Sequence, residues 1–450
     1  MISFLYLTSF GCIVVFLIRS IIKDKYLTIF NVFLFTLSFL YLLVPGLMFL
    51  FGKSKSTLSN VIITSTDNQR INSYIYIMTM ICIILLAKIK FRHKVKFNNE
   101  CKCSLIRVEE YNRIVYTVCV KWFWVLFIIG IIGFLMMASQ IGLTGFIKYS
   151  GKARGADAEL SGSMIGYGKF LAKFMIASLS PGIMIFETSK KNAYKILLVF
   201  VFVLSFMLEI FIAGKSNFIL FLLPFLMRII GRNKESIDFK KIALIGTVAL
   251  CLVFVLDNWF YKLETGESVN QYRNNWTIDQ YFIRYLHEYI YPYSNLLLSK
   301  KMNQEFGYRL FVDYLAVVIN FIPATLLNGF QIKLLYPEVT KCYEIISLSE
   351  SAGVPADFLT FCIRQLGIIG VLVIPFCRSK LFQCIDSHMF RVKMYCDAMK
   401  INAFHILTCC SAFGFVSVLI EPYSAISTQP ILFTSIIIII QLSNRFYNAE

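Results

Sequence analysis

The chain has 450 residues, of which 58% are hydrophobic and only 16% are charged. Ordinary soluble domains are about half apolar and about a quarter charged, so one soluble core cannot bury this excess. The composition therefore excludes an ordinary soluble protein and predicts an all-α polytopic membrane protein. The formal net charge of +18 would suggest a nucleic-acid partner in a soluble protein, but here the positions of the basic residues explain it.

Apolar segments near the length that crosses a bilayer, about 20 residues, recur along the chain and predict about 11 transmembrane helices. We expect them near residues 2–18, 27–50, 72–88, 114–137, 167–187, 196–213, 217–231, 242–257, 357–377, 401–420 and 426–443. The segment at 217–231 is short and contains Pro224. No basic residue precedes the first segment and no small-residue cleavage pattern follows it, so we expect it to be retained rather than removed as a signal peptide.

Basic residues are dense in alternate loops, for example in the run KIKFRHKVK at 88–96. By the positive-inside rule these loops belong in the cytoplasm, which predicts an external N-terminus and a cytoplasmic C-terminus. Residues 1–450 then form a single polytopic membrane domain. It carries an external basic loop at 139–165 and one large external loop at 257–356, and long loops of this kind are usually functional.

The segment at 311–330 is also apolar enough to span the membrane. If it did, the basic loop at 378–400 would lie outside, against the positive-inside rule. It also contains Asp313, Asn320 and Pro323. We therefore predict an interfacial or re-entrant helix.

The stretch RYLHEYIYPYSN, 284–295, lies in the large external loop. If it is helical, Arg284, His287, Glu288 and Tyr291 share one face, and Pro292 ends or kinks the helix. Such a helix on the membrane surface would present a row of polar groups, with His287 or Glu288 available as a base. Alternatively, this is a solvent-facing helix whose arginine and glutamate pair across one turn.

Further cations lie in segments that we expect on the external side: Lys152, Arg154, Lys215, Arg273, Arg309 and Arg364. Arg364 falls inside the predicted span 357–377, seven residues beyond Asp357, so the two side chains could share a helix face. An arginine inside the membrane costs at least about 2.5 kcal/mol and is a functional hypothesis by default, although its head could instead reach the interface. Arginine binds a diphosphate through paired N–H donors, so these cations indicate binding of an anionic lipid head group.

Three local segments and the layout of the whole chain resemble a known family. The segments are YIYPYSNLL in the large loop, SESAGVPADFLTFCIRQLGIIG leading into a span, and the short turn AGKSN. With many spans, a late large external loop and a smaller external loop bearing arginine, the chain resembles the Wzy-type polymerases of O-antigen or capsular repeat units. The family commonly has arginine in the short turn, where this chain has Lys215, which keeps the charge but lacks the bidentate fork.

The resemblance implies a glycosyltransferase of the bacterial inner membrane that joins repeat units carried on undecaprenyl diphosphate, with no metal and no nucleotide cofactor. It implies that Arg154 and Arg284 contact the diphosphate or glycan and that His287 is a base or orients the acceptor. Supporting contacts are expected from Lys152, Lys215, Arg273, Glu288, Tyr291, Arg309, Asp357 and Arg364. The expected partners are the lipid-linked glycan, membrane lipid and a regulator of polysaccharide chain length.

Two other functions fit the same external cations. A flippase or transporter of lipid-linked glycan would be expected to show internal repeats and charges lining its central helices, and the chain has no evident repeat. An O-antigen ligase, which transfers the finished glycan to a lipid core, would use similar cations. A purely structural membrane protein would leave the long external loop without a purpose.

Overall fold

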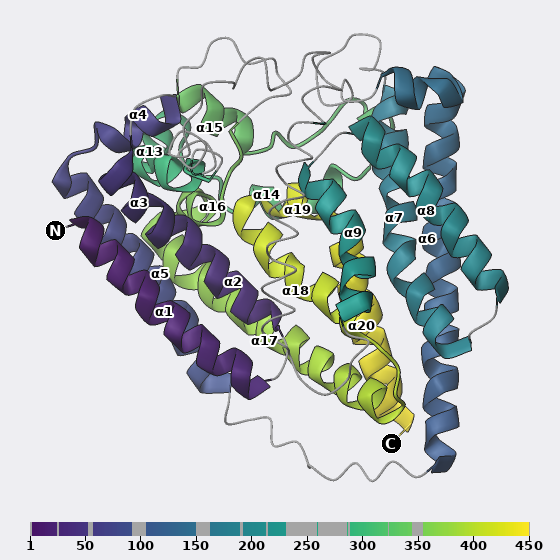
Figure 1. Ribbon diagram of the computed structural model, residues 1–450. Helices are drawn as coiled ribbons and strands as arrows, with labels where there is room; N and C mark the ends of the chain where they lie inside the picture. Colours follow the sequence, from purple (N-terminus) through teal and green to yellow (C-terminus); the bar gives the residue numbers. More distant parts are fainter. Residues whose placement is uncertain are drawn as a thin grey trace. The chain divides into compact units, whose positions relative to one another are not determined.

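The computed structural model describes most of the chain and contains α-helices, short 3-10 and π segments, and no strand among the residues it describes (Figure 1). The described residues are 2–24, 27–52, 57–91, 105–149, 163–189, 192–212, 215–230, 259, 286, 289–322, 324–343 and 354–449. The chain divides into two compact units, each discontinuous in sequence. Unit 1 comprises Met1–Phe97, Asn275–Cys384 and Phe413–Ile426, and unit 2 comprises Asn98–Asn274, Ile385–Ala412 and Ser427–Glu450.

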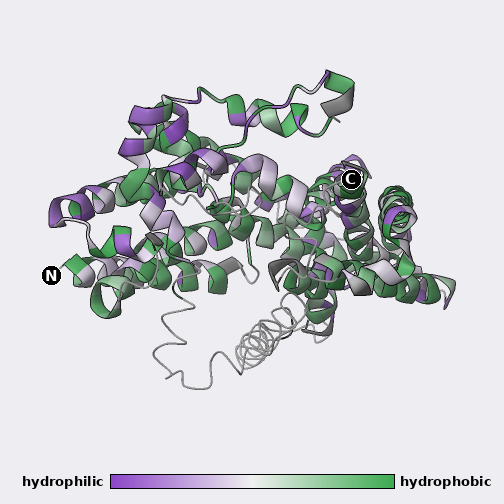
Figure 2. Cartoon of the chain, turned by 90° about the horizontal axis from the view of Figure 1, so that it is seen from above, coloured by the Kyte–Doolittle hydropathy of each residue, from purple (hydrophilic) through white to green (hydrophobic). Residues whose placement is uncertain are grey.

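The described helices confirm the all-α, multi-pass membrane architecture. Eight of them are long and apolar enough to cross a bilayer, and hydrophobic residues, green in Figure 2, are spread through the helical ribbons. The eight segments are Ile2–Ile22, Ile29–Phe51, Asp67–Lys88, Val108–Phe146, Met164–Ser189, Asn192–Phe211, Ile368–Ala398 and Pro430–Ala449. Two further predicted spans coincide with shorter apolar helices, Phe218–Arg228 and Phe404–Leu419, and the span predicted at 242–257 lies outside the described residues.

Unit 1 joins N-terminal helices to the described parts of the large predicted loop. Its helices are α1 (Ile2–Asp24), α2 (Ile29–Ser38), the π-helical η1 (Phe39–Leu43), α3 (Val44–Phe51), α4 (Thr57–Ile63), α5 (Asp67–Phe91), α13 (Tyr291–Phe306), α14 (Val312–Ile319), the 3-10 helix η4 (Ala324–Leu327), α15 (Tyr336–Cys342) and α16 (Phe358–Leu366). Parts of α17 (Ile368–Ala398), α18 (Phe404–Leu419) and α19 (Pro422–Thr428) complete it. Phe33 of α2 packs edge-on against Phe358 and Phe382, with ring centroids 5.3 and 5.0 Å away, and so ties α2 to α16 and α17.

Unit 2 is built mainly from long apolar helices. These are α6 (Leu105–Lys148), α7 (Ser163–Ser189), α8 (Asn192–Ile212), α9 (Lys215–Ile230) and α20 (Pro430–Ala449), with the remaining parts of α17 and α18. A Cβ atom on Gly130 or Gly133 of α6 would collide with the backbone of Met175 or Ala172 in α7. Small residues at this contact therefore let the two helix backbones approach closely, as they do in many membrane bundles.

The structure corrects the predicted span at 357–377. This segment is not one helix, because Gly367 interrupts it with a positive φ of 61° between α16 and α17. A left-handed φ is accessible to glycine and ends helices at this position. Arg364 therefore lies in the last turn of the short helix α16, before the apolar segment that begins at Ile368.

The structure also adds detail to two other predicted segments, 139–165 and 311–330. The basic loop expected at 139–165 is helical in its first part, because α6 continues to Lys148, with a break in helical geometry at Gly142, where φ is 70°. The apolar segment 311–330 forms α14 and η4. With eight and four residues, these two helices are too short to cross a bilayer.

Candidate functional site

The short helix α16 carries two of the predicted site residues, one near each end. Asp357 is its N-cap, and the Asp357 carboxylate accepts a hydrogen bond from the backbone N–H of Thr360 at 3.0 Å. Aspartate is among the preferred N-cap residues because it satisfies a free N–H of the first turn. Arg364 lies in the last turn, and both residues face α13, where Asp357 contacts Asn295 and Arg364 contacts Met302.

Asp357 is completely buried and lies at the centre of a network of neutral hydrogen-bond donors. Its Oδ1 accepts from Nδ2 of Asn295 at 2.9 Å, and its Oδ2 accepts from the hydroxyl of Tyr41. The Asn295 side-chain oxygen in turn accepts from the Tyr343 hydroxyl at 2.7 Å. Burial raises the pKa of Asp357, and the hydrogen bonds from Thr360, Tyr41 and Asn295 oppose that rise.

Tyr41 reaches Asp357 from η1, the π-helical turn inside the span Ile29–Phe51. The N–H of Val44 bonds to the carbonyl of Phe39, which widens this turn. The next residue, Pro45, has no N–H to continue an α-helical ladder. Single π turns inside α-helices are frequent at functional sites, and this one turns a tyrosine toward the N-terminus of α16.

Arg364 is fully buried and uses its guanidinium to hold α13 and α15 against α16. Its Nη1 donates to the carbonyls of Met302 and Gly307 and to Oδ1 of Asn303, the last at 2.8 Å. Its Nη2 lies 2.6 Å from a carboxylate oxygen of Glu338. Its Nε has no hydrogen-bond partner. The partners of the two Nη atoms are needed, because an unpaired buried charge is strongly destabilising.

Arg309 meets the other oxygen of Glu338 at 2.6 Å, so this one carboxylate bridges two arginines. Arg309 also pairs with Asp313, one helical turn later, at 2.7 Å. Its backbone N–H donates to the carbonyl of Arg364 at 2.8 Å, and the N–H of Leu310 donates to the carbonyl of Gln365. These bonds occupy carbonyls at the C-terminal end of α16, which would otherwise lack donors.

Glu421 extends the acidic side of this cluster. It accepts a hydrogen bond from the N–H of Leu335 at 3.0 Å and is almost completely buried. Burial, with a smaller contribution from the nearby Asp313, raises the pKa of Glu421 to about 7, although the Leu335 N–H and Arg309 act to lower it. With Arg309 and Arg364 as the cations and Asp313, Glu338 and Glu421 as the acids, the cluster is close to neutral overall.

Four of the predicted site residues therefore meet in unit 1. Besides Asp357, Arg309 and Arg364, Tyr291 is buried and donates a hydrogen bond from its hydroxyl to the carbonyl of Leu419 at 2.7 Å. It interacts electrostatically with Asp357, and burial raises its pKa. Pro292 stands in the first turn of α13, where its missing N–H is no loss. The helix that it is predicted to end or kink lies mostly outside the described residues.

The remaining predicted site residues are not placed by the structure. Lys215 is the first residue of α9, and the structure does not describe its side chain. The others lie outside the described residues: Lys152, Arg154, Arg273, Arg284, His287 and Glu288. Their roles stay predictions.

The sequence analysis missed Tyr41, Asn295, Glu338 and Glu421. Local signals existed for one of them, since Glu338 follows a proline at the start of a helix, a position that favours acids. None existed for Tyr41, which lies 316 residues before Asp357 in the chain. Contacts at such a separation come from the tertiary fold and leave no local pattern.

The N–H groups of the two arginines are bonded mainly to acceptors in the protein, so the cluster holds helices together and leaves few donors for a ligand. Arg364 is fully buried, and Glu338, whose side chain is 23% exposed, is the most accessible of the residues in its ion pairs with the two arginines. An anion could reach either arginine only by displacing a protein carboxylate or carbonyl. The cluster can therefore keep the first turn of α17 and the segments before it in fixed positions. A preorganised site needs its surrounding helices held in this way.

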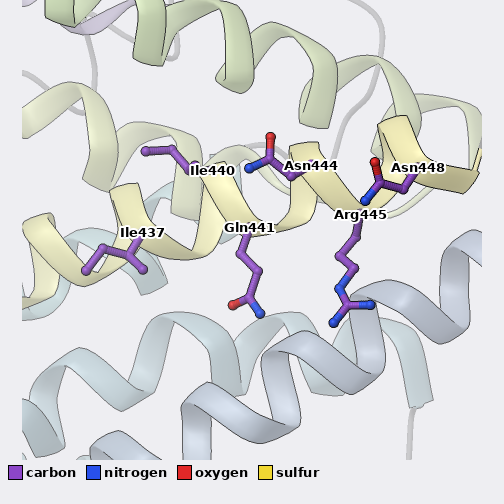
Figure 3. Close-up of a pocket in the computed structure, with 6 residues that line it drawn as sticks. All are labelled: Ile437, Ile440, Gln441, Asn444, Arg445 and Asn448. Atoms are coloured by element: carbon purple, nitrogen blue, oxygen red, sulfur yellow. The ribbon is translucent and has the colours of Figure 1, made fainter.

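A separate cavity of about 340 Å³ lies in unit 2, along α20 (Figure 3). Its lining residues are Ile437, Ile440, Gln441, Asn444, Arg445 and Asn448. Gln441 and Arg445 project to the same side of the helix in Figure 3, and Gln441 accepts a hydrogen bond from the indole N–H of Trp122. None of the predicted site residues lines this cavity.

Compared with known proteins, the chain matches no protein-family model, no curated protein and no solved structure.

Proposed function

We propose that the protein polymerises oligosaccharide repeat units carried on undecaprenyl diphosphate into O-antigen or a related surface polysaccharide. In this reaction a hydroxyl of a new lipid-linked unit attacks the anomeric carbon of the growing glycan. The bond from that carbon to the diphosphate oxygen breaks, the acceptor hydroxyl loses its proton, and undecaprenyl diphosphate leaves with the electron pair. The protein is then a glycosyltransferase of the bacterial inner membrane, acting on the external face.

One observation supports the proposal most strongly: a buried, charged cluster joins residues of the predicted external loop to the helix that follows it, in a multi-pass membrane architecture. Arg309, Glu338 and Arg364 hold α13, α15 and α16 immediately before the apolar segment of α17. A lipid-linked substrate requires this combination, because its chain lies in the bilayer while its reacting sugar and diphosphate lie at the membrane surface. The sequence resemblance to the Wzy-type polymerases supports the same function.

The chemistry assigns different tasks to the polar residues. Neutralising the charge that develops on the leaving diphosphate is the main catalytic requirement, and we assign it to Arg154 and Arg284. Lys152, Lys215 and Arg273 support them with further positive charge, and His287, with Glu288 next to it in the sequence, takes the acceptor proton or orients the acceptor. Arg309, Asp357 and Arg364 support the site by positioning its helices, and Tyr291 packs within that support.

The orientation follows from the basic loops, with the N-terminus outside and the C-terminus in the cytoplasm. In this orientation the loops at 139–165 and 257–356 both face the external side. The partners are the lipid-linked glycan, the surrounding membrane lipid and a regulator of chain length. The reaction needs no metal or nucleotide, because the diphosphate already activates the sugar.

The first experiment resolves the surface polysaccharide of a strain lacking this gene on a gel. We expect lipid core bearing one repeat unit, since export and ligation would continue without polymerisation. A core without any repeat unit would instead indicate the ligase or the flippase, and long glycan accumulating on its carrier lipid would single out the ligase. An unchanged ladder of bands would contradict all three functions.

A second experiment returns variants to that strain. Arg154→Ala and Arg284→Ala should leave the single-repeat pattern in place at normal protein amounts, whereas the wild-type gene restores the ladder. Restoration of full polymer length and yield by either variant would remove that arginine from the diphosphate contacts. Lys333→Ala, at an exposed lysine of unit 1, is the matched control and should restore the ladder.

A further inference from the structure

The last helix of unit 2, α20, changes in composition along its length. Its first part, PILFTSIIIII, is mostly apolar, and its last part, QLSNRFYNA, is rich in polar residues. The 20 residues of this helix rise about 30 Å, which matches the thickness of the hydrocarbon core of a bilayer. When the first part lies in the hydrocarbon core, the polar end of α20 therefore lies at the level of the lipid head groups.

The cavity along α20 follows this change of composition (Figure 3). Counted from Ile437, its described lining residues are spaced at i, i+3, i+4, i+7, i+8 and i+11, so they form one stripe along the helix. Ile437 and Ile440 line the apolar end and are half-buried. The polar end is exposed and is lined by Asn444, Arg445 and Asn448. The cavity is therefore apolar toward the membrane core and rich in hydrogen-bond donors toward the surface.

The polar end of the cavity carries a positive charge, and no carboxylate is among the described residues that line it. Arg445 forms no ion pair with any residue that the structure describes. Its guanidinium has several N–H donors and no acceptor, and such a group binds phosphate through paired N–H donors. The amide groups of Asn444 and Asn448 add further donors. This combination of groups fits an anionic phosphate rather than a cation.

Gln441 lies between the two ends of the cavity, and its orientation is fixed. Its Oε1 accepts a hydrogen bond from the indole N–H of Trp122 at 2.5 Å. An indole N–H can only donate, so the amide oxygen of Gln441 must face Trp122, and the amide NH2 group points elsewhere. That NH2 group bonds to no residue in the described part of the chain. Tryptophan is enriched at membrane interfaces, so Trp122 supports a position of Gln441 near the head groups.

The order of groups along the cavity matches the order of groups along a phospholipid. Gln441 and Arg445 project to the same side of α20 in Figure 3, and they lie one turn, about 6 Å, apart along the helix. In a phospholipid the ester carbonyls lie next to the phosphate, and the acyl chains continue from them into the bilayer. A phosphate at Arg445 would therefore place an ester carbonyl near Gln441 and an acyl chain beside Ile440. A soluble phosphate would leave the apolar end of the cavity empty.

We propose that the stripe along α20 is a binding site for an anionic phospholipid. Arg445, Asn444 and Asn448 bind its phosphate. The NH2 group of Gln441 donates to an ester carbonyl, and the apolar end of the cavity contacts one acyl chain. The cavity volume, about 340 Å³, is in the range of ligand pockets, about 300–1,000 Å³, so it holds the phosphate and the start of one chain while the rest of the lipid stays in the bilayer.

The proposed orientation places this site in the cytoplasmic leaflet, whose anionic lipids attract basic residues. None of the residues that line the cavity has a role in the proposed polymerisation. The lipid site and the polymerase activity can therefore be tested separately, and either can fail without the other.

The test measures thermal stabilisation of the purified full-length protein, in detergent and stripped of lipid, by three added probes. The probes are phosphatidylglycerol, which is anionic, phosphatidylcholine, which has no net charge, and water-soluble glycerol phosphate. A ligand that binds the folded protein raises the unfolding midpoint. We expect phosphatidylglycerol to raise the midpoint of the wild-type protein at lower concentrations than phosphatidylcholine does, and glycerol phosphate to raise it least.

Arg445→Gln removes the charge and keeps a polar side chain. Its affinity for phosphatidylglycerol should fall about tenfold to about a hundredfold, the loss expected for a charged hydrogen-bond partner. Its midpoint without lipid should stay unchanged, because Arg445 is exposed. Arg445→Lys should keep part of the affinity. The matched control is Arg19→Gln, at an exposed arginine near the end of the span Ile2–Ile22, and it should bind phosphatidylglycerol as the wild-type protein does.

A second variant tests the apolar end of the cavity and leaves the charge in place. Ile440→Phe adds volume where the acyl chain is expected, so it should weaken the binding of phosphatidylglycerol and leave the response to glycerol phosphate unchanged. This variant decides the question even where Arg445→Gln yields too little folded protein. Binding of phosphatidylglycerol by Ile440→Phe with wild-type affinity would remove the acyl chain from the cavity and overturn the proposal.

The remaining outcomes are equally decisive. Equal losses of affinity in Arg445→Gln and Arg19→Gln would indicate a general attraction of anionic lipid to basic residues, and not a site on α20. Equal stabilisation by phosphatidylcholine would show that the charge is not recognised, and equal stabilisation by glycerol phosphate would indicate a site for a free anion; either result overturns the proposal. A loss confined to Arg445→Gln and Ile440→Phe supports it.

Discussion

The hydroxyl of Tyr41 donates a hydrogen bond to the buried carboxylate of Asp357, 316 residues later in the chain. The same hydroxyl accepts the N–H of Leu359 at 3.1 Å. The pair therefore fastens the N-terminus of α16 to a membrane-spanning segment near the start of the chain.

Removing that hydroxyl should destabilise the protein. Tyr41→Phe leaves an oxygen of Asp357 and the N–H of Leu359 short of a partner in a buried place. We expect a loss of about 1–3 kcal/mol in the free energy of unfolding, seen as a lower midpoint of thermal unfolding in detergent. Tyr447→Phe, at an exposed position, removes the same atom and should leave the midpoint unchanged. Equal midpoints for both variants would contradict a structural role for the Tyr41 hydroxyl.

The main role of Arg364 should be to stabilise the folded protein rather than to contact the substrate. Arg364→Lys keeps one charge but cannot reach the three acceptors on α13 and Glu338 together. We expect lower amounts of folded protein in membranes and a lower unfolding midpoint, from a loss of about 3–5 kcal/mol. Fluorescence size-exclusion chromatography after heating measures both. Normal stability with lost activity would instead make Arg364 a direct substrate contact.

Glu421 should make stability depend on pH. Burial raises its pKa from 4.5 in the unfolded chain to about 7. The folded protein then holds the proton more tightly, so its stability falls as the pH rises from 4.5 through about 7, and no loss occurs below that range. The shift corresponds to at most about 3 kcal/mol.

Glu421→Gln provides the matched comparison. It cannot lose a proton in this range, so the difference in unfolding midpoint between wild type and variant should change steadily between pH 4.5 and 7. The variant should gain relative to wild type as the pH rises. Parallel curves would show that Glu421 titrates at its ordinary value.

The exposed face of α14 should contact lipid. Leu315 and Val318 are 58% and 67% exposed on this helix. Ile368 and Ile369, which directly follow the C-terminal end of α16, are exposed as well. Spin labels at 315 and 318 in nanodiscs should be accessible to oxygen and protected from a water-soluble nickel complex. A label at the exposed Gln331 should show the opposite. Nickel access at all three positions would place α14 in water.

Gly367 should tolerate no side chain. At φ 61° an alanine is strained by about 1–2 kcal/mol, and its Cβ would lie 3.2 Å from the Tyr308 hydroxyl. Gly367→Ala should therefore lower the unfolding midpoint. Gly166→Ala, in α7 with no atom near the added methyl group, should be neutral or stabilising. Similar midpoints for the two variants would argue against the helix break at Gly367.

Much of the fold was predictable, because apolar runs of membrane length leave a strong periodic and compositional signal. Their exact ends were less predictable. The segment at 357–377 is mostly apolar, and the backbone conformation of Gly367 divides it. Pro292 illustrates the same limit, since a proline fits both the end of one helix and the first turn of the next.

The site was predictable where its contacts are local. Spacing alone indicated that Asp357 and Arg364 share a face, and both do contact α13. Arg309 and Asp313, one turn apart, could also be paired from sequence. Tyr41, Asn295 and Glu338 could not, since their partners lie far away in the chain and only the packed helices bring them together.

The spacing between Asp357 and Arg364 has a consequence for how this protein can change over evolutionary time. One residue inserted within α16 would turn Arg364 by about 100° around the helix axis and away from Met302, Asn303 and Glu338. Substitutions elsewhere on that helix leave its register intact, whereas any change of its length does not. Related proteins should therefore differ in the residues of this segment but keep its length.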